Sequence, residues 1–196
     1  MFNSLFISDI DADGRLDDIA EINPSRPLSK NEIAQCFDMS TLPLKGCIPI
    51  GGELKPYNGG MRFQNGDTIL ARITPCLENG KAAYINILAD DEIAFGSTEY
   101  IVLTSKGYCP NSFFYFLVRN EVFIKFAVQH MNGSSGRQRV LGTDIANFPI
   151  KTPSKESLQK FDTVASKVLE QMRLSSYEIS RLEQLKALIT ATLSSR

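Results

Sequence analysis

Several signatures of membrane, exported and metal-binding proteins are missing from this chain of 196 residues. No apolar run approaches the roughly 18 residues that a membrane span needs, and the N-terminus lacks the basic start and cleavage site of a signal peptide. The four cysteines form no C-x-x-C pair, which argues against a zinc site and a disulfide framework. The sequence therefore predicts a soluble, cytoplasmic protein with free thiols and no metal site.

Motifs of catalysis are also missing. The chain contains no nucleophile elbow, no HExxH zinc motif and no Rossmann fingerprint. Its single histidine, His130, follows Phe126 by four residues, on the apolar face of a predicted helix, so a partly buried structural role is favoured over catalysis. The chain is predicted to bind rather than to catalyse, and to carry no cofactor of its own.

Neither sign of charge is in large excess, since the net charge is -1. The charges are unevenly placed, however, because residues 1–38 hold eight acidic and three basic side chains, whereas residues 39–196 hold fourteen acidic and eighteen basic ones. A surplus of four positive charges fits a limited phosphate-contacting face. It excludes a protein that coats nucleic acid by charge alone.

Glycine and proline are absent from residues 154–196, so nothing in this stretch interrupts a helix. Apolar residues recur there at alternating spacings of three and four, the pattern of a helix that pairs with another helix. At about 1.5 Å per residue the helix would be roughly 65 Å long, more than a domain of this size covers. We expect it to project and to bury an apolar seam against a partner helix: Leu158, Phe161, Ala165, Val168, Met172, Ile179, Leu182, Ile189 and Leu193.

The seam contains two polar positions, Ser175 and Lys186. The simplest partner is a second copy of the chain in antiparallel orientation. An ordinary amphipathic helix that packs along its own domain is the alternative.

The sequence predicts an α+β domain over residues 1–152 and the long helix over residues 153–196. Alternating apolar residues in GDTILAR, KAAYINI and EIAFGSTEYIVLTS predict strands of a mixed or antiparallel sheet. The stretch after Ser112 is dense in Phe, Leu and Val and predicts helices that cover this sheet. Residues 40–66 are rich in Gly and Pro and predict long surface loops, where specificity often resides.

One weak pattern suggests an enzyme. Asp38, Glu53 and Lys55 echo the two acids and the lysine of some metal-dependent nucleases, in which carboxylates hold Mg²⁺. The spacing is loose and Glu53 falls in a predicted loop, so a nuclease ranks as the third hypothesis.

Longer strings carry a family resemblance. GDTILARITPCLENGK, FGSTEYIVL and MNGSSGRQRV, followed by a proline before the long helix, resemble specificity subunits of type I restriction-modification systems from about Leu16 to Arg196. The resemblance implies a DNA target-recognition domain followed by a spacer helix. The family usually carries two of each, so the chain resembles a half-length subunit. In TPSKESLQ, where the family more often shows a double proline and then Glu-Gln, only Pro153 and Glu156 remain.

The resemblance also implies a role in an assembly. The expected function is a non-catalytic subunit that reads a bipartite site on double-stranded DNA and positions methyltransferase and restriction subunits. S-adenosylmethionine, Mg²⁺ and ATP would belong to those partner subunits. The main alternative is a coiled-coil scaffold or anti-restriction protein that reads no DNA.

Polar and basic side chains on the predicted turns are the candidate DNA contacts. Arg and Lys bind guanine edges or phosphates, Asn and Gln pair with adenine, and Ser suits either role. Turn capping is favoured over contact for Ser97 and Thr98, and contact is favoured for the arginines and the glutamine that follow the flexible GSSG segment. The candidates are Arg72, Asn79, Lys81, Ser97, Thr98, Ser134, Ser135, Arg137, Gln138 and Arg139.

Overall fold

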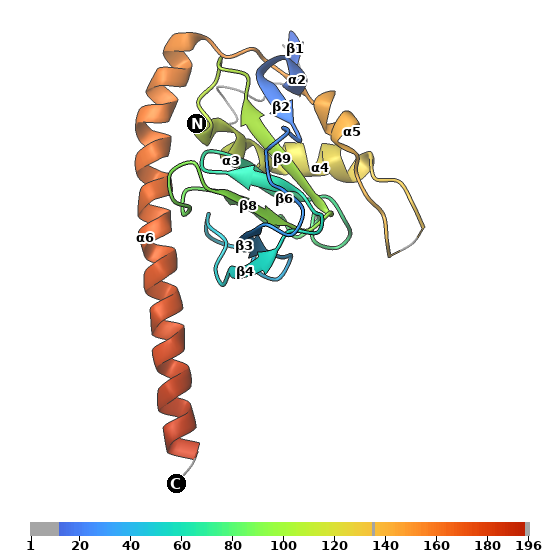
Figure 1. Ribbon diagram of the computed structural model, residues 1–196. Coiled ribbons are helices and arrows are strands. Elements are labelled where there is room, and N and C mark those ends of the chain that lie inside the picture. The colour runs from blue at the N-terminus through green and yellow to red at the C-terminus, as the bar shows by residue number, and fades with distance from the viewer. Residues whose placement is uncertain (1–11, 135, 195–196) are drawn as a thin grey trace.

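The computed structural model describes residues 12–134 and 136–194. A head formed by most of the chain sits beside the helix α6 (Lys155–Ser194), which runs along one flank of the head and extends beyond it (Figure 1). Its 40 residues correspond to a length of roughly 60 Å. The predicted α+β class, with mixed sheets, covering helices and a long C-terminal helix, is confirmed.

The first sheet is antiparallel and has the strand order β2-β9-β6-β7. Ile69 of β6 pairs with Val102 of β9, and Leu70 pairs with Ile101. All four residues of β6 are buried because both faces of this sheet are covered. The strands are β2 (Ala20–Ile22), β6 (Thr68–Ala71), β7 (Ala82–Tyr84) and β9 (Tyr100–Ser105).

The second sheet has the order β4-β3-β8-β5, and its β3 and β8 strands are parallel. Two of its strands lie within residues 40–66, so the prediction of loops throughout that segment is wrong. Every residue of β4 is exposed, which removes the apolar alternation on which strand prediction depends. The strands are β3 (Ile33–Phe37), β4 (Glu53–Pro56), β5 (Arg62–Gln64) and β8 (Ile93–Gly96).

Two hydrophobic clusters hold these layers together. Ile69 and Val102 face the second sheet and pack with Phe63, whereas Leu70 and Ile101 face the helices. The covering helices are α3 (Ser112–Val118) and α4 (Glu121–Gln129).

The single histidine lies just beyond α4. His130 stacks on Phe126 with ring centroids 4.1 Å apart but is exposed, so the expectation of partial burial is wrong.

A small sheet joins the two ends of the head. Gly14 pairs with Ile150 and Arg15 with Pro149 in an antiparallel bridge, directly before the chain enters α6. Short helices flank this bridge and bury Leu16 and Ile145. The elements are β1 (Gly14–Arg15), α2 (Leu16–Ile19), α5 (Gly142–Ala146) and β10 (Pro149–Ile150).

The first half of α6 packs on the head of its own chain. Leu158, Phe161 and Ala165 are at most 7% exposed and belong to the same cluster as α3 and α4. Leu169, which was not part of the predicted seam, is 2% exposed. For these first three seam residues the own-domain alternative is therefore correct.

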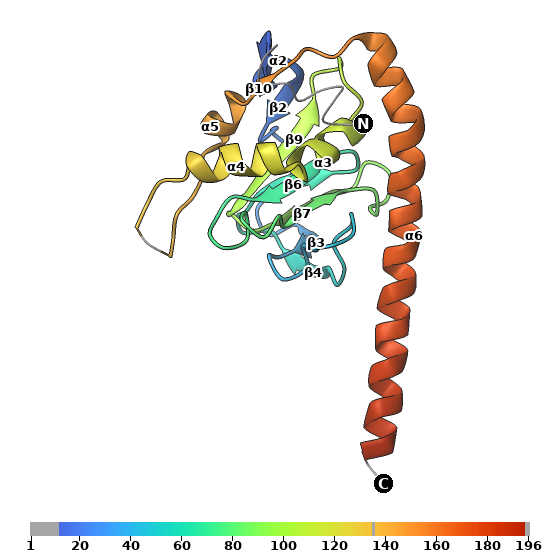
Figure 2. The ribbon, with the colours of Figure 1, turned by 180° about the vertical axis from the view of Figure 1, so that it is seen from behind.

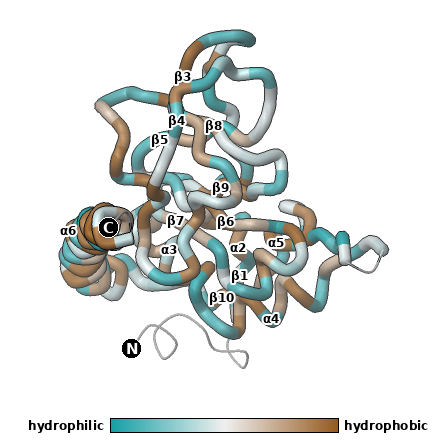
Figure 3. Tube along the Cα trace, turned by 90° about the horizontal axis from the view of Figure 1, so that it is seen from below, coloured by the Kyte–Doolittle hydropathy of each residue, from teal (hydrophilic) through white to brown (hydrophobic). Residues whose placement is uncertain are grey.

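The second half of α6 is exposed. Beyond Met172, apolar side chains that include Ile179, Leu182 and Leu193 are more than half exposed, with fractions of 56, 58 and 67%. Figure 3, which views the molecule along this helix, shows hydrophobic and hydrophilic residues alternating around it. A surface of this kind is unusual on an isolated helix in water.

Candidate nucleic-acid interface

Three segments that are distant in sequence meet at Glu99. Arg72 follows β6, Glu99 precedes β9, and Arg139 lies between α4 and α5. The Nη2 atom of Arg139 donates to Oε1 of Glu99 at 2.7 Å, and Nε of Arg139 lies 2.9 Å from both carboxylate oxygens. Nε of Arg72 donates to Oε2 at 3.2 Å. One carboxylate therefore binds two guanidinium groups.

The electrostatics of this cluster follow from its geometry. The hydrogen bonds from Arg139 lower the pKa of Glu99, and Arg72 adds to this effect, while partial burial opposes it. The side chains of Arg72, Glu99 and Arg139 are 28, 22 and 37% exposed, so water screens these ion pairs only in part. Two cations and one anion leave the cluster with a net positive charge that suits an anionic ligand.

Arg139 lies at the base of a hairpin that is formed by residues 131–140 and projects from the head (Figure 1). Asn132 and Arg139 exchange two backbone hydrogen bonds of 2.9 Å. Further backbone bonds attach the hairpin to the end of β6, since Thr74 donates to Gln138 at 3.1 Å and Val140 donates to Arg72 at 3.0 Å. Figures 1 and 2 show the hairpin on the flank of the head opposite α6.

The tip of the hairpin carries exposed polar groups. Gly133 and Gly136 have φ angles of 126° and 81°, which favour glycine and allow the chain to reverse. Ser134 and Arg137 are exposed, whereas Gln138 is partly buried. Ser135 lies outside the described residues.

The turn before β9 supplies Glu99 to the cluster. The Oγ atom of Ser97 accepts a hydrogen bond of 3.0 Å from the backbone nitrogen of Glu99, as the turn-capping interpretation predicts. Thr98 is exposed beside it.

The remaining two candidates lie further along the loop between β6 and β7 that Arg72 begins. Asn79 is exposed, and Nζ of Lys81 donates to the carbonyl of Met39 at 2.8 Å. Arg119, at the end of α3, donates to the carbonyl oxygens of Gly80 and Gly46, each at 2.6 Å. The structure thus groups Arg72, the Ser97 turn and the hairpin around Glu99. The side chain of Lys81, at the other end of the same β6–β7 loop, bonds to Met39 instead.

Sequence reasoning missed Glu99 and Arg119. Glu99 stands within the FGSTE string, where an acidic side chain gives no local signal of a role in DNA binding. Arg119 follows an apolar helix directly, and nothing in the sequence indicates that it bonds to carbonyl groups.

Comparison with known proteins identifies the family to which the chain belongs. No protein-family model matches the chain. The chain is 33% identical over 150 residues to the specificity subunit of the Escherichia coli type I restriction enzyme EcoAI, which covers 72% of this chain and 25% of that subunit. It is 29% identical over 195 residues to the EcoEI specificity subunit of the same organism, covering 91% and 32%. The chain belongs to the family of type I restriction specificity subunits.

The chain spans only about a quarter to a third of the length of these specificity subunits. A solved structure, the HsdS subunit of Thermoanaerobacter tengcongensis, has a similar fold with a TM-score of 0.57 at 19% identity, over 87% of this chain and 46% of that chain. The likeness supports the architecture of a head followed by a long helix.

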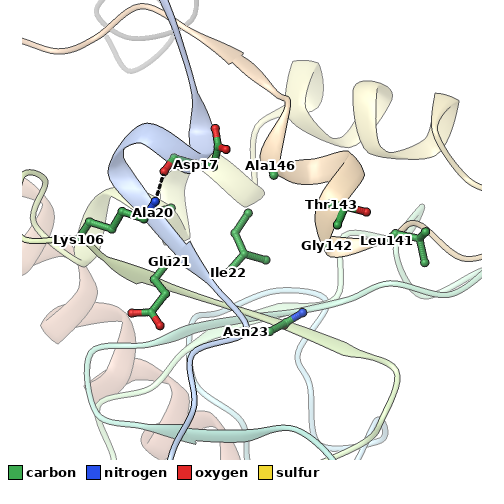
Figure 4. Close-up of a pocket in the computed structure, with 10 residues that line it drawn as sticks. All are labelled: Asp17, Ala20, Glu21, Ile22, Asn23, Lys106, Leu141, Gly142, Thr143 and Ala146. Atoms are coloured by element: carbon green, nitrogen blue, oxygen red, sulfur yellow. Dashed lines mark hydrogen bonds between the residues drawn. The ribbon is translucent and has the colours of Figure 1, made fainter.

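Two hollows in the surface of the head lie away from the cluster of Arg72, Glu99 and Arg139. A cavity of about 500 Å³ between β2 and α5 has a mostly uncharged lining that includes three charged residues, Asp17, Glu21 and Lys106. The ammonium group of Lys106 donates to the carbonyl of Asp17 there (Figure 4). A groove of about 430 Å³ runs between α6 and the segment that contains Pro43 and Ile48. None of the described candidate DNA contacts lines either hollow.

The nuclease hypothesis gains no support in residues 12–134 and 136–194. Glu53 is paired with Lys55 at 2.7 Å on an exposed strand, and Asp38 accepts a hydrogen bond from Ser40. Within these ranges no group of three or more His, Cys, Asp or Glu residues could hold a metal ion. In the same ranges no helix has both the length and the apolar character required to cross a bilayer.

Proposed function

We propose that this chain recognises a specific DNA sequence as part of a type I restriction-modification complex. The observation that carries the proposal is the projecting hairpin, whose exposed Arg137 stands beside the arginine pair bound to Glu99, on a chain whose relatives are specificity subunits. Phosphate contacts would come from exposed cations of this edge, and base contacts from the tip of the hairpin.

The chemistry of the complex is assigned to other chains. A methyltransferase subunit and a restriction subunit would be positioned on the DNA by this chain and would carry S-adenosylmethionine, Mg²⁺ and ATP. The chain itself acts as a non-catalytic reader in this proposal.

The exposed half of α6 is proposed to pair with a second copy. Ser175 and Lys186 lie at equal distances on either side of the midpoint between Ile179 and Leu182. An antiparallel copy centred there places each Ser175 opposite a Lys186 and places Ile179 opposite Leu182. Both polar positions are thereby matched with each other, which favours one register over its neighbours.

The same register would also place part of the partner helix over the groove beside α6. It places Met172 opposite Ile189 and Val168 opposite Leu193, and Met172 and Val168 both line the groove. The C-terminal turns of one helix would therefore cover the groove of the other chain. In this register the two helices overlap only over residues 167–194, so the pair spans roughly 75 Å from one Lys155 to the other, slightly more than two turns of B-DNA, with a head at each end. The proposed target is a palindromic site with two halves and an unread spacer.

Methylation mapping tests this function. The chain is produced with its methyltransferase subunit in a host that lacks other modification systems, and methylated positions are mapped across the genome. We expect one bipartite palindrome. The assembled complex should also bind that site roughly 1,000-fold or more tightly than a scrambled duplex, and less tightly as salt rises. Equal affinity for both duplexes would overturn the proposal and favour a scaffold or anti-restriction protein.

A further inference from the structure

Glu99 lies within the proposed DNA-binding surface, where a negative charge does not increase the affinity for DNA. A carboxylate repels phosphate groups, yet this one lies between two arginines that were themselves candidates for DNA contact. Its partners are separated from it by 27 and 40 residues in sequence, so the contacts are products of the fold. The arrangement calls for a physical explanation.

The Arg139 contact is bidentate. Two nitrogen atoms of the guanidinium group meet the carboxylate, and a planar pair of this kind fixes both distance and orientation. The Nη1 atom of the same group donates to the carbonyl of Arg137 at 3.2 Å. The side chain of Arg139 therefore connects Glu99 at its base to the backbone of the exposed residue near the tip.

The hairpin is attached to the head at its base. Backbone hydrogen bonds at Thr74 and Val140 and the buried side chain of Val140 make this attachment, whereas Ser134 and Arg137 near the tip are exposed. An isolated hairpin is at best marginally stable in water. A pair of arginines bound to one carboxylate supplies a side-chain connection among β6, β9 and the hairpin.

We infer that Glu99 is a positioning residue for DNA recognition: it holds Arg139 and Arg72 as parts of the framework, so that Arg137 is presented to the DNA at a fixed place. The inference rests on the proposed function. Glu99 also limits the attraction of the two arginines for any phosphate, which converts a basic patch that would bind all sequences into one that favours a single sequence. Arg139 is a support in this scheme rather than a reader of bases.

The Glu99→Gln variant tests the inference because it removes the charge and preserves the size of the side chain. In the full chain assembled with the methyltransferase subunit, we expect affinity for a scrambled duplex to increase. The slope of log affinity against log salt should steepen by roughly 1. Discrimination between the mapped site and the scrambled duplex should fall roughly 10-fold or more, the size of one lost base contact.

Two variants complete the design. Asp90→Asn makes the same change in charge at an exposed position between β7 and β8 and should leave discrimination unchanged. Glu99→Asp keeps the charge and should restore the salt slope. If Glu99→Gln weakens binding to both duplexes equally, or alters neither, Glu99 is only a structural residue and the inference fails.

A measurement without DNA separates this inference from the proposed function. Hydrogen exchange at the backbone amides of Asn132 and Val140 should accelerate in Glu99→Gln but not in Asp90→Asn. Unchanged exchange would overturn the inference even if the wild-type complex reads DNA. A wild-type complex without sequence preference would instead overturn the proposed function.

Discussion

Ser112 of α3 donates a hydrogen bond of 2.7 Å from its Oγ atom to Oδ1 of Asp162 on α6. The next residue towards the N-terminus on α6, Phe161, packs edge-to-face on Phe113 and Phe116 with centroid distances of 6.1 and 5.5 Å. These contacts make the first half of α6 a part of the head. The direction in which the exposed half leaves the head is therefore set by the fold.

The first prediction concerns this attachment. Phe161→Ala should lower the free energy of unfolding by about 3–5 kcal/mol, because it removes a buried aromatic ring and leaves a cavity. Leu193→Ala, at a position that is 67% exposed, should change it by about 0.5 kcal/mol or less while the chain is monomeric. Urea unfolding at low protein concentration measures both. Similar losses in the two variants would contradict the separation of α6 into a packed and an exposed half.

The second prediction concerns the exposed half. Ile179→Asp places a charge at the centre of the proposed helix pair and should reduce the solution mass from a dimer to a monomer, as measured by light scattering. Leu188→Asp introduces the same charge at another exposed position of α6, which is outside the seam, and serves as its matched control. A monomeric wild-type chain at micromolar concentration would exclude the homodimer.

The third prediction fixes the register. A chain that carries both Ser175→Cys and Lys186→Cys should form a disulfide between two copies, because these residues are opposite each other in the proposed pairing. Ser175→Cys alone should not, since the two copies of residue 175 would be roughly 16 Å apart along the axis, beyond the range of about 4–7 Å that a disulfide spans. Non-reducing gels distinguish these results, and cross-linking in the Ser175→Cys chain alone would contradict this register.

Only some elements of this fold have local signals in the sequence. The helix of residues 154–196 and the strand at Ile69 could be predicted because periodicity and the absence of Gly and Pro act within the segment itself. Strand β4 could not, since its pairing with β3 is between distant residues and its side chains face solvent. The burial of Leu158 likewise depends on where α3 lies.

The candidate site shows the same limit. The sequence indicates Arg72 and Arg139 as cations on turns, but only the fold brings them to one carboxylate. A partner that lies 27 or 40 residues away has no local signature. The roles of the ten candidates as DNA contacts stay predictions.

The fourth prediction separates the two arginines of the hairpin. Arg137 is exposed, so Arg137→Ala should leave stability unchanged within about 0.5 kcal/mol. If Arg137 contacts a base, the change weakens binding by about 1–3 kcal/mol and relaxes one position of the site, whereas loss of a phosphate contact weakens binding to all sequences alike. Arg139→Ala should reduce stability as well, because it leaves Glu99 with Arg72 alone. Binding to a panel of single-base variants of the site measures the pattern, and no effect of Arg137→Ala on any duplex would exclude a contact.

The last prediction concerns pH. The hydrogen bonds from Arg139, followed by those from Arg72, lower the pKa of Glu99 from its ordinary value of 4.5. A carboxyl group whose pKa is lower in the folded state stabilises the fold above its unfolded pKa, and this stabilisation is lost as the pH falls through the folded value. The difference in unfolding free energy between the wild type and Glu99→Gln should therefore be constant near neutral pH and shrink as the pH decreases below about 4.5. Urea unfolding between about pH 7 and pH 3 measures this difference. In the Arg139→Ala background the pH-dependent part should be much smaller, since the largest cause of the shift is then absent. A difference that does not vary with pH would mean that the ionised form of Glu99 is bound no more tightly than the neutral form, and the ion pairs would then contribute nothing to holding the hairpin.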